Sequence, residues 1–185
     1  VDNKTVKYEV LYNIGVIKGA NMPVNALSHS VRKGLIESLL KLTEDNKVQG
    51  IVLIGEGRTF FAGADISEFG KPMMSPDLNE VINTFENSSK PIVAALHGTP
   101  LGGGLELAMG CNYRVALRST RLGLPEVTLG IIPGAGGTQR LPRLAGVEKA
   151  LSMITSGAPV NAESALQSNI VEEVYDEALL ANAIN

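Results

Sequence analysis

Two glutamates each lie beside a cluster of glycines, and this pairing is the strongest chemical signal in the chain. Glu106 ends the stretch Leu-Gly-Gly-Gly-Leu-Glu (101–106), and Glu126 belongs to Pro-Glu-Val-Thr-Leu-Gly-Ile-Ile-Pro-Gly-Ala-Gly-Gly (125–137). Glycine turns let a backbone approach a ligand closely and aim N–H groups at it. A carboxylate beside such a turn can move protons on that ligand. The pair therefore predicts acid–base chemistry on a polarised carbonyl.

The surroundings of the two glutamates predict different protonation. Glu106 falls in the first turns of a helix predicted at 103–109, where the positive end of the helix dipole favours an ionised carboxylate. Glu126 lies in the apolar stretch 124–129, which should desolvate it, raise its pKa and suit a proton donor. A glutamate side chain is usually exposed to solvent. The apolar neighbours in sequence argue against exposure of Glu126, and less strongly against exposure of Glu106.

Other reactive side chains receive structural interpretations. Asp65 is a rival carboxylate, but a turn or capping role suits it better. His29 and His97 have no serine or cysteine nucleophile motif nearby, and His97 reads as a packing or hydrogen-bonding residue at a strand end. Cys111 reads as a small buried core residue. One cysteine and two histidines do not supply a Cys/His zinc site, so no metal is expected.

The composition indicates a soluble globular domain. Of 185 residues, 44% are hydrophobic and 19% are charged. A net charge of −3 and the absence of tryptophan argue against nucleic acid as a partner. The apolar runs are too short to span a bilayer, so no membrane partner is expected.

Nucleotide-binding motifs also match poorly. Gly-Ala-Gly-Gly-Thr-Gln (134–139) departs from G-x-G-x-x-G, which makes dinucleotide binding a weak interpretation. The sequence contains neither a P-loop motif nor the G-x-S-x-G nucleophile elbow.

Strands alternate with helices along the chain, which predicts an α/β domain with crossover connections. Residues 28 or 30 are expected to cap a helix whose apolar stripe runs through 31, 35, 39 and 42. The predicted strands are 6–10, 14–17, 50–55, 91–96, 113–117, 121–123 and 171–174, and the other predicted helices are 77–87, 103–109, 137–144, 148–155, 162–167 and a last one towards 185.

Two small-residue turns follow neighbouring buried strands of this pattern. Residues 60–66 come after the strand at 51–54, and residues 101–106 come after the strand at 92–96. Ligands gather at the carboxyl ends of strands in α/β sheets. We expect each turn to contribute one N–H group to the same anionic oxygen.

At these residues the chain resembles the enoyl-CoA hydratase/isomerase (crotonase) superfamily. The matching motifs, in the family's order, are Pro-Val-Asn-Ala-Leu (23–27), Phe-Ala-Gly-Ala-Asp-Ile (61–66), His-Gly (97–98), Gly-Gly-Gly-Leu-Glu-Leu (102–107), Pro-Glu (125–126) and Gly-Gly-Thr-Gln-Arg-Leu (136–141). Residues 123–130 and 154–157 look most like the N-terminal hydratase/isomerase part of peroxisomal-type bifunctional enzymes of β-oxidation.

The resemblance implies a spiral of ββα units and a set of roles. The N–H groups of Ala64 and Gly103 would form an oxyanion hole for a thioester oxygen, and main-chain groups of Asp65 and Ile66 would line the adenine side of an acyl-CoA. Glu106 and Glu126 would be the catalytic carboxylates, binding the water that adds to C3, with Glu126 giving a proton to C2. For isomerisation of 3-enoyl to 2-enoyl thioesters, Glu126 alone would move the proton.

The resemblance also implies the context. Residues 1–185 would be the hydratase/isomerase core domain of a longer polypeptide, without the family's C-terminal helical region, so the oligomeric state stays open. Acyl-CoA is the substrate, no cofactor is needed, and NAD enters only with a downstream dehydrogenase part. A peroxisomal location is favoured, with mitochondrial or bacterial cytoplasmic location as alternatives. The alternative functions are a pure isomerase and a non-catalytic binding module, including RNA binding.

Overall fold

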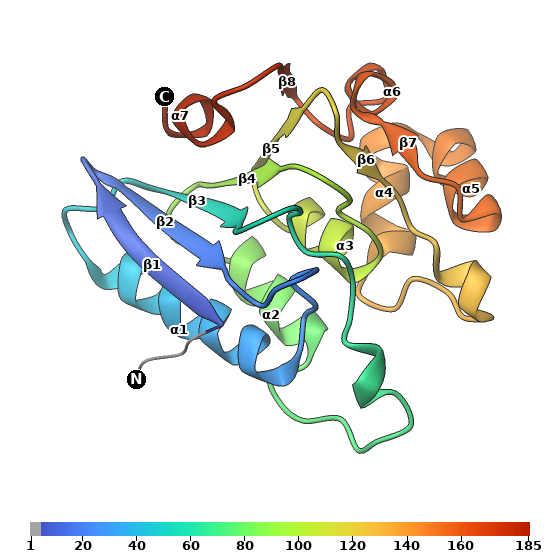
Figure 1. The fold of residues 1–185 in the computed structure, drawn as a ribbon, viewed down its shortest axis with the longest axis horizontal. Coiled ribbons are helices and arrows are strands. Elements are labelled where there is room, and N and C mark those ends of the chain that lie inside the picture. Colours follow the sequence, from blue (N-terminus) through green and yellow to red (C-terminus); the bar gives the residue numbers. More distant parts are fainter. Residues whose placement is uncertain (1–4) are drawn as a thin grey trace.

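A six-stranded sheet forms the centre of the computed structural model, which describes residues 5–185 (Figure 1). The strand order is β1-β2-β3-β4-β5-β8, and only β1 runs antiparallel to its neighbour. The strands are β1 (Val6–Leu11), β2 (Ile14–Gly19), β3 (Gly50–Gly55), β4 (Ile92–Leu96), β5 (Tyr113–Leu117) and β8 (Glu173–Tyr175). Each later strand adds to the same side of the sheet, which requires a crossover after each parallel strand.

Both faces of the central strands are covered, which explains their continuous apolar sequences. Alternation along β3 sends Ile51 and Leu53 into the main core and Val52 into a smaller one. The main core lies under α1 (His29–Glu44), α2 (Leu78–Glu86) and α3 (Gly103–Met109), whereas α7 (Leu179–Ile184) packs on the opposite face. The sheet therefore fixes the positions of the turns that follow its strands, which are described below.

The stripe predicted for α1 is confirmed, and Ser28 is its N-cap residue, but the side-chain capping bond expected there is not formed. Val31, Leu35, Leu39 and Leu42 are all buried. Ser28 precedes the helix, yet its hydroxyl makes no capping bond and lies 3.1 Å from the hydroxyl oxygen of Ser30. A distant carboxylate serves instead: Glu68 accepts the N–H of His29 at 2.7 Å.

The remaining elements lie beside the sheet (Figure 1). They are η1 (Ile66–Glu68), β6 (Arg121–Leu122), η2 (Glu126–Leu129), α4 (Gly137–Ala145), α5 (Val147–Ser156), β7 (Val160–Asn161) and α6 (Ala162–Gln167). Among them β6, α4, α5 and α6 were predicted, whereas η1, η2 and β7 were not. The strand predicted at 171–174 is observed as β8, which begins two residues later. Ile170 and Val171 lie in the connection before β8, and their side chains are buried in the main core. The α/β class predicted from sequence is confirmed, and no helix within residues 5–185 is long and apolar enough to cross a membrane.

Candidate active site

A cavity of about 690 Å³ opens where the turns after β3 and β4 meet. Its lining includes residues 62–66 and 101–103 from these two turns, together with both candidate glutamates. Residues 66–74 and the loop 129–135 supply much of the remaining wall. Both turns therefore line one cavity, as expected from their positions after neighbouring strands.

Two backbone N–H groups lie together on this lining. The nitrogen of Ala64 is 3.5 Å from the position that a Cβ on Gly103 would occupy. None of the hydrogen bonds found within residues 5–185 uses the N–H of Ala64 or of Gly103. Both amides can therefore donate to a ligand in the cavity.

The glycines at this turn are required by close packing. Gly102 has φ of 51°, which a residue with a side chain rarely adopts. A Cβ on Gly104 would lie 1.8 Å from the carbonyl oxygen of Phe61. The start of α3 thus rests directly on the turn after β3, and this contact brings the two amides together.

Glu106 is anchored from a distant loop. Its Oε1 accepts the N–H groups of Ala135 at 2.9 Å and of Gly137 at 2.8 Å. The side chain is buried, with only 2% of the residue exposed. Two amide donors fix the carboxylate in one orientation.

The helix dipole does not decide the pKa of Glu106, contrary to the expectation from sequence. Burial raises the pKa of Glu106, and this effect exceeds the lowering by the amides of Gly137 and Ala135 and by the charge of Arg140. Desolvation penalises the ionised carboxylate more than one end of a short helix favours it. The expectation that Glu106 is less enclosed than Glu126 is also wrong, since Glu126 retains 9% exposure.

Glu126 is the first residue of η2, and its environment matches the prediction. Burial raises the pKa of Glu126 to about 7, and the charge of Glu106 adds to the rise. Its Oε2 is buried and has no hydrogen-bond partner within the described part of the chain. A carboxyl group with a free buried oxygen and a pKa near neutrality can give or take a proton at physiological pH.

The raised pKa of Glu126 has a consequence for stability. The native state holds this proton between pH 4.5 and about 7 whereas the unfolded state loses it, so native stability falls as pH rises through that window. We expect the free energy of unfolding of the wild type to fall by about 2–3 kcal/mol relative to that of Glu126→Gln between about pH 4.5 and pH 8. Denaturant unfolding at both pH values measures this, and equal pH dependence in the two proteins contradicts it.

The other residues singled out from sequence take structural positions. The carboxylate of Asp65 caps η1 by accepting the N–H of Ser67 at 2.9 Å. Nε2 of His97 lies 2.9 Å from the carbonyl oxygen of Gly55. Cys111 is buried, which raises the pKa of its thiol to about 12. Asp65 and Ile66 both line the cavity, and residues 5–185 contain no cluster of side chains suited to a metal ion.

Sequence reasoning missed the residues that hold Glu106. Ala135 and Gly137 belong to the glycine run that was assigned to Glu126 and to a ligand, not to Glu106. Arg140 donates to the carbonyl oxygen of Ala135 at 3.1 Å and pairs with Glu86 at 2.7 Å, so it holds this loop against α2. A glycine run directly before a helix offers free N–H groups, and that signal could have indicated an anion-binding turn.

Comparison with known proteins agrees with this architecture. The family model described as Enoyl-CoA hydratase/isomerase matches residues 10–185. The chain is 46% identical over 172 residues to the peroxisomal bifunctional enzyme of Danio rerio, covering 92% of this chain. It is 45% identical over 165 residues to a probable enoyl-CoA hydratase of Bacillus subtilis (strain 168), covering 85% of this chain.

The relatives are longer than the chain. The alignments span 24% of the Danio rerio protein and 64% of the Bacillus subtilis protein. The chain thus corresponds to about a quarter of the length of the bifunctional relatives that it matches.

Solved structures identify the fold family of the chain. An enoyl-CoA hydratase from Bacillus anthracis superposes with a TM-score of 0.89 at 34% identity, covering 97% of this chain and 74% of that one. An enoyl-CoA hydratase from Thermoplasma volcanium GSS1 gives a TM-score of 0.89 at 31% identity, covering 97% and 75%. The crotonase-type fold expected from sequence is confirmed, and the chain belongs to the enoyl-CoA hydratase/isomerase family.

Proposed function

We propose that the chain hydrates 2-trans-enoyl-CoA to 3-hydroxyacyl-CoA and also isomerises 3-enoyl to 2-enoyl thioesters, as part of fatty acid β-oxidation. One observation carries the proposal: two buried carboxylates and two unpaired backbone N–H groups line a single cavity. The names of the relatives, which include a probable enoyl-CoA hydratase, support the choice of substrate.

The two N–H groups activate the thioester. The oxygen of the thioester carbonyl accepts from Ala64 and Gly103, and it gains negative charge as the transition state becomes enolate-like. Donors that are already fixed stabilise that charge without reorganising, and the loss of one such donor typically costs about 3–4 kcal/mol of barrier.

The two glutamates move the protons of hydration. Both carboxylates hold a water molecule against C3, and the water oxygen forms the new C–O bond while one of its protons passes to ionised Glu106. Protonated Glu126 gives its proton to C2 as the double-bond electrons shift. Glu106 returns a proton to Glu126 through solvent, so the sum is one water added across C2 and C3.

Isomerisation uses Glu126 alone. Its ionised carboxylate takes a proton from C2 of a 3-enoyl thioester, the oxyanion hole holds the dienolate, and the same carboxyl group delivers the proton to C4. Neither reaction transfers electrons to an acceptor, so acid–base groups and the oxyanion hole supply the whole chemistry and no cofactor is required. NAD would serve only a dehydrogenase part of a longer polypeptide.

The names and organisms of the relatives support a choice of cell compartment. Those from Danio rerio and Homo sapiens are named peroxisomal, while the Bacillus subtilis relative is bacterial. We favour peroxisomal β-oxidation, with mitochondrial or bacterial cytoplasmic location as the alternatives.

The two activities should respond oppositely to pH. Because the pKa of Glu126 is about 7, raising the pH through this value removes the proton donor of hydration and creates the base of isomerisation. We expect kcat/KM for hydration to fall and kcat/KM for isomerisation to rise, each approaching about tenfold per pH unit on its limiting side. Loss of enoyl absorbance of 2-butenoyl-CoA and formation of 2-enoyl product from a 3-enoyl-CoA measure the two rates.

The outcomes of this experiment are distinct. Opposite slopes between about pH 6 and pH 8 support the assigned protonation states. Parallel slopes contradict the division of labour, and the absence of any turnover of 2-butenoyl-CoA contradicts the proposed function.

A further inference from the structure

One wall of the cavity is the segment 66–77, called here the wall segment, which links the turn after β3 to α2. It contributes the apolar side chains of Ile66, Phe69, Met73 and Met74 to the cavity lining. Apolar and flexible methionine side chains suit contact with a hydrocarbon chain of variable length. The position of this segment therefore sets the shape of this part of the cavity.

The wall segment has no anchor in the hydrophobic core. None of residues 66–77 is buried, and its one regular element is the short η1. A segment without buried apolar contacts needs polar bonds to hold one conformation.

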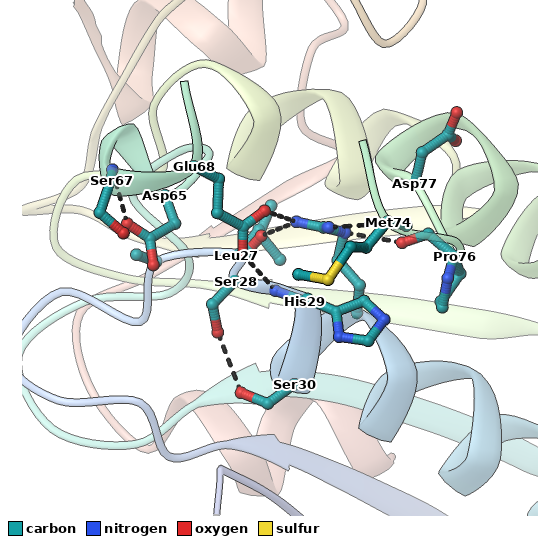
Figure 2. Close-up of polar contacts among 12 residues, drawn as sticks. Leu27, Ser28, His29, Ser30, Asp65, Ser67, Glu68, Met74, Pro76 and Asp77 are labelled. Atoms are coloured by element: carbon teal, nitrogen blue, oxygen red, sulfur yellow. Dashed lines mark hydrogen bonds and ion pairs between the residues drawn. The ribbon is translucent and has the colours of Figure 1, made fainter. Parts of the chain in front are cut away.

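Arg32 of α1 supplies those bonds. Its guanidinium donates to the carbonyl oxygens of Pro76 at 2.7 Å and Met74 at 3.4 Å, and to the carboxylate of Glu68 at 2.8 Å (Figure 2). A further bond joins it to the carbonyl oxygen of Leu27 at 2.8 Å. Only 4% of Arg32 is exposed, so one buried cation ties both ends of the wall segment to the start of α1.

Glu68 completes this connection. One oxygen of its carboxylate pairs with Arg32, and the other accepts the N–H of His29 at the first turn of α1. The ring of His29 in turn lies 2.9 Å from the carbonyl oxygen of Ser75. Figure 2 shows Glu68, His29, Met74 and Pro76 gathered at this point. Both members of the Arg32–Glu68 pair also line the cavity.

Each end of the wall segment also has a support that does not involve Arg32. Asp77 and Glu80 form a capping box at the start of α2, and Asp65 caps η1. Loss of the ion pair should therefore loosen residues 66–76 while the turns that carry Ala64 and Gly103 stay in place.

We propose that the Arg32–Glu68 pair positions the wall segment and thereby sets the affinity for the acyl tail, a role that rests on the proposed function. A pre-formed wall binds a long tail without first being ordered. A loosened wall must be ordered by the tail itself, and this cost appears in KM rather than in the chemical step. Arg32 and Glu68 are positioning residues, distinct from the carboxylates that move protons.

The test compares a short and a long substrate in the full protein. In Glu68→Gln we expect KM for 2-decenoyl-CoA to rise about tenfold, while kcat for 2-butenoyl-CoA stays within about twofold of the wild type. Arg32→Lys keeps the charge but loses the planar fork that reaches the backbone carbonyls, so it should shift KM in the same direction. Glu56→Gln, which breaks the Lys7–Glu56 ion pair away from the cavity, is the matched control and should change neither constant.

Equal changes of KM for both substrates, or a fall in kcat for 2-butenoyl-CoA with KM unchanged, overturn the positioning role. Hydrogen exchange at residues 66–77 tests the ion pair without turnover. Faster exchange confined to this segment in Glu68→Gln supports the proposal, and unchanged exchange overturns it. A wild-type protein that leaves 2-butenoyl-CoA unchanged contradicts the proposed function instead, and exchange still tests the ion pair.

Discussion

Replacing Glu126 by glutamine is expected to abolish both hydration and isomerisation. Glu126 gives the proton to C2 in one reaction and carries the proton from C2 to C4 in the other, so no step of either avoids it. General acid–base help is worth about 10²–10⁴ in rate, and we expect kcat of both reactions to fall by at least about 10³. Steady-state assays with 2-butenoyl-CoA and a 3-enoyl-CoA measure the two losses.

This variant tests proton transfer because it preserves the shape of the site. Glutamine has the outline of a protonated glutamate, and the side chain sits close against the turn at Gly102, where a Cβ would lie 3.0 Å from Oε1 of Glu126. Glu163→Gln is the matched control, since Glu163 is exposed and pairs with Arg118 outside the cavity. Retention of either activity in Glu126→Gln contradicts the role of Glu126 in that reaction.

Replacing Glu106 by glutamine should separate the two activities. Hydration needs Glu106 to hold the water and accept its proton, whereas isomerisation involves no water. We expect hydration to fall by about 10²–10⁴ while isomerisation stays within about tenfold of the wild type. The same pair of assays measures the ratio of the two rates.

The structure makes Glu106→Gln a selective change. The amide oxygen of glutamine can still accept the N–H groups of Ala135 and Gly137, so the loop 133–137 keeps its anchor. The variant loses the charge and the ability to accept a proton from water. Intact hydration in this variant contradicts the two-carboxylate mechanism and favours a pure isomerase, in which Glu106 is only a structural neighbour.

Local signals explain the parts of the fold that could be predicted. The glycine triplet followed by Leu105 gave the helix 103–109 with the bounds that α3 has, because the turn and the helix start are encoded within a few residues. The apolar neighbours of Glu126 likewise led to the prediction of a raised pKa, and burial does raise it.

Long-range contacts explain the parts that could not be predicted. Glu106 is buried by the loop 133–137, which lies far along the chain, and nothing near Glu106 in the sequence indicates this. The cap of α1 comes from Glu68 rather than from Ser28, for the same reason. Local rules name the residues at a helix end, but tertiary packing decides which carboxylate reaches it.

On the proposed function, this cavity adds water across the double bond of an enoyl thioester. The most direct measurement is mass spectrometry of the product after 2-butenoyl-CoA is incubated with the full protein in water labelled with deuterium and heavy oxygen. Hydration by the two carboxylates predicts 3-hydroxybutyryl-CoA with heavy oxygen at C3 and one deuterium at C2. Unchanged substrate, or a product that carries neither label, would contradict the claim.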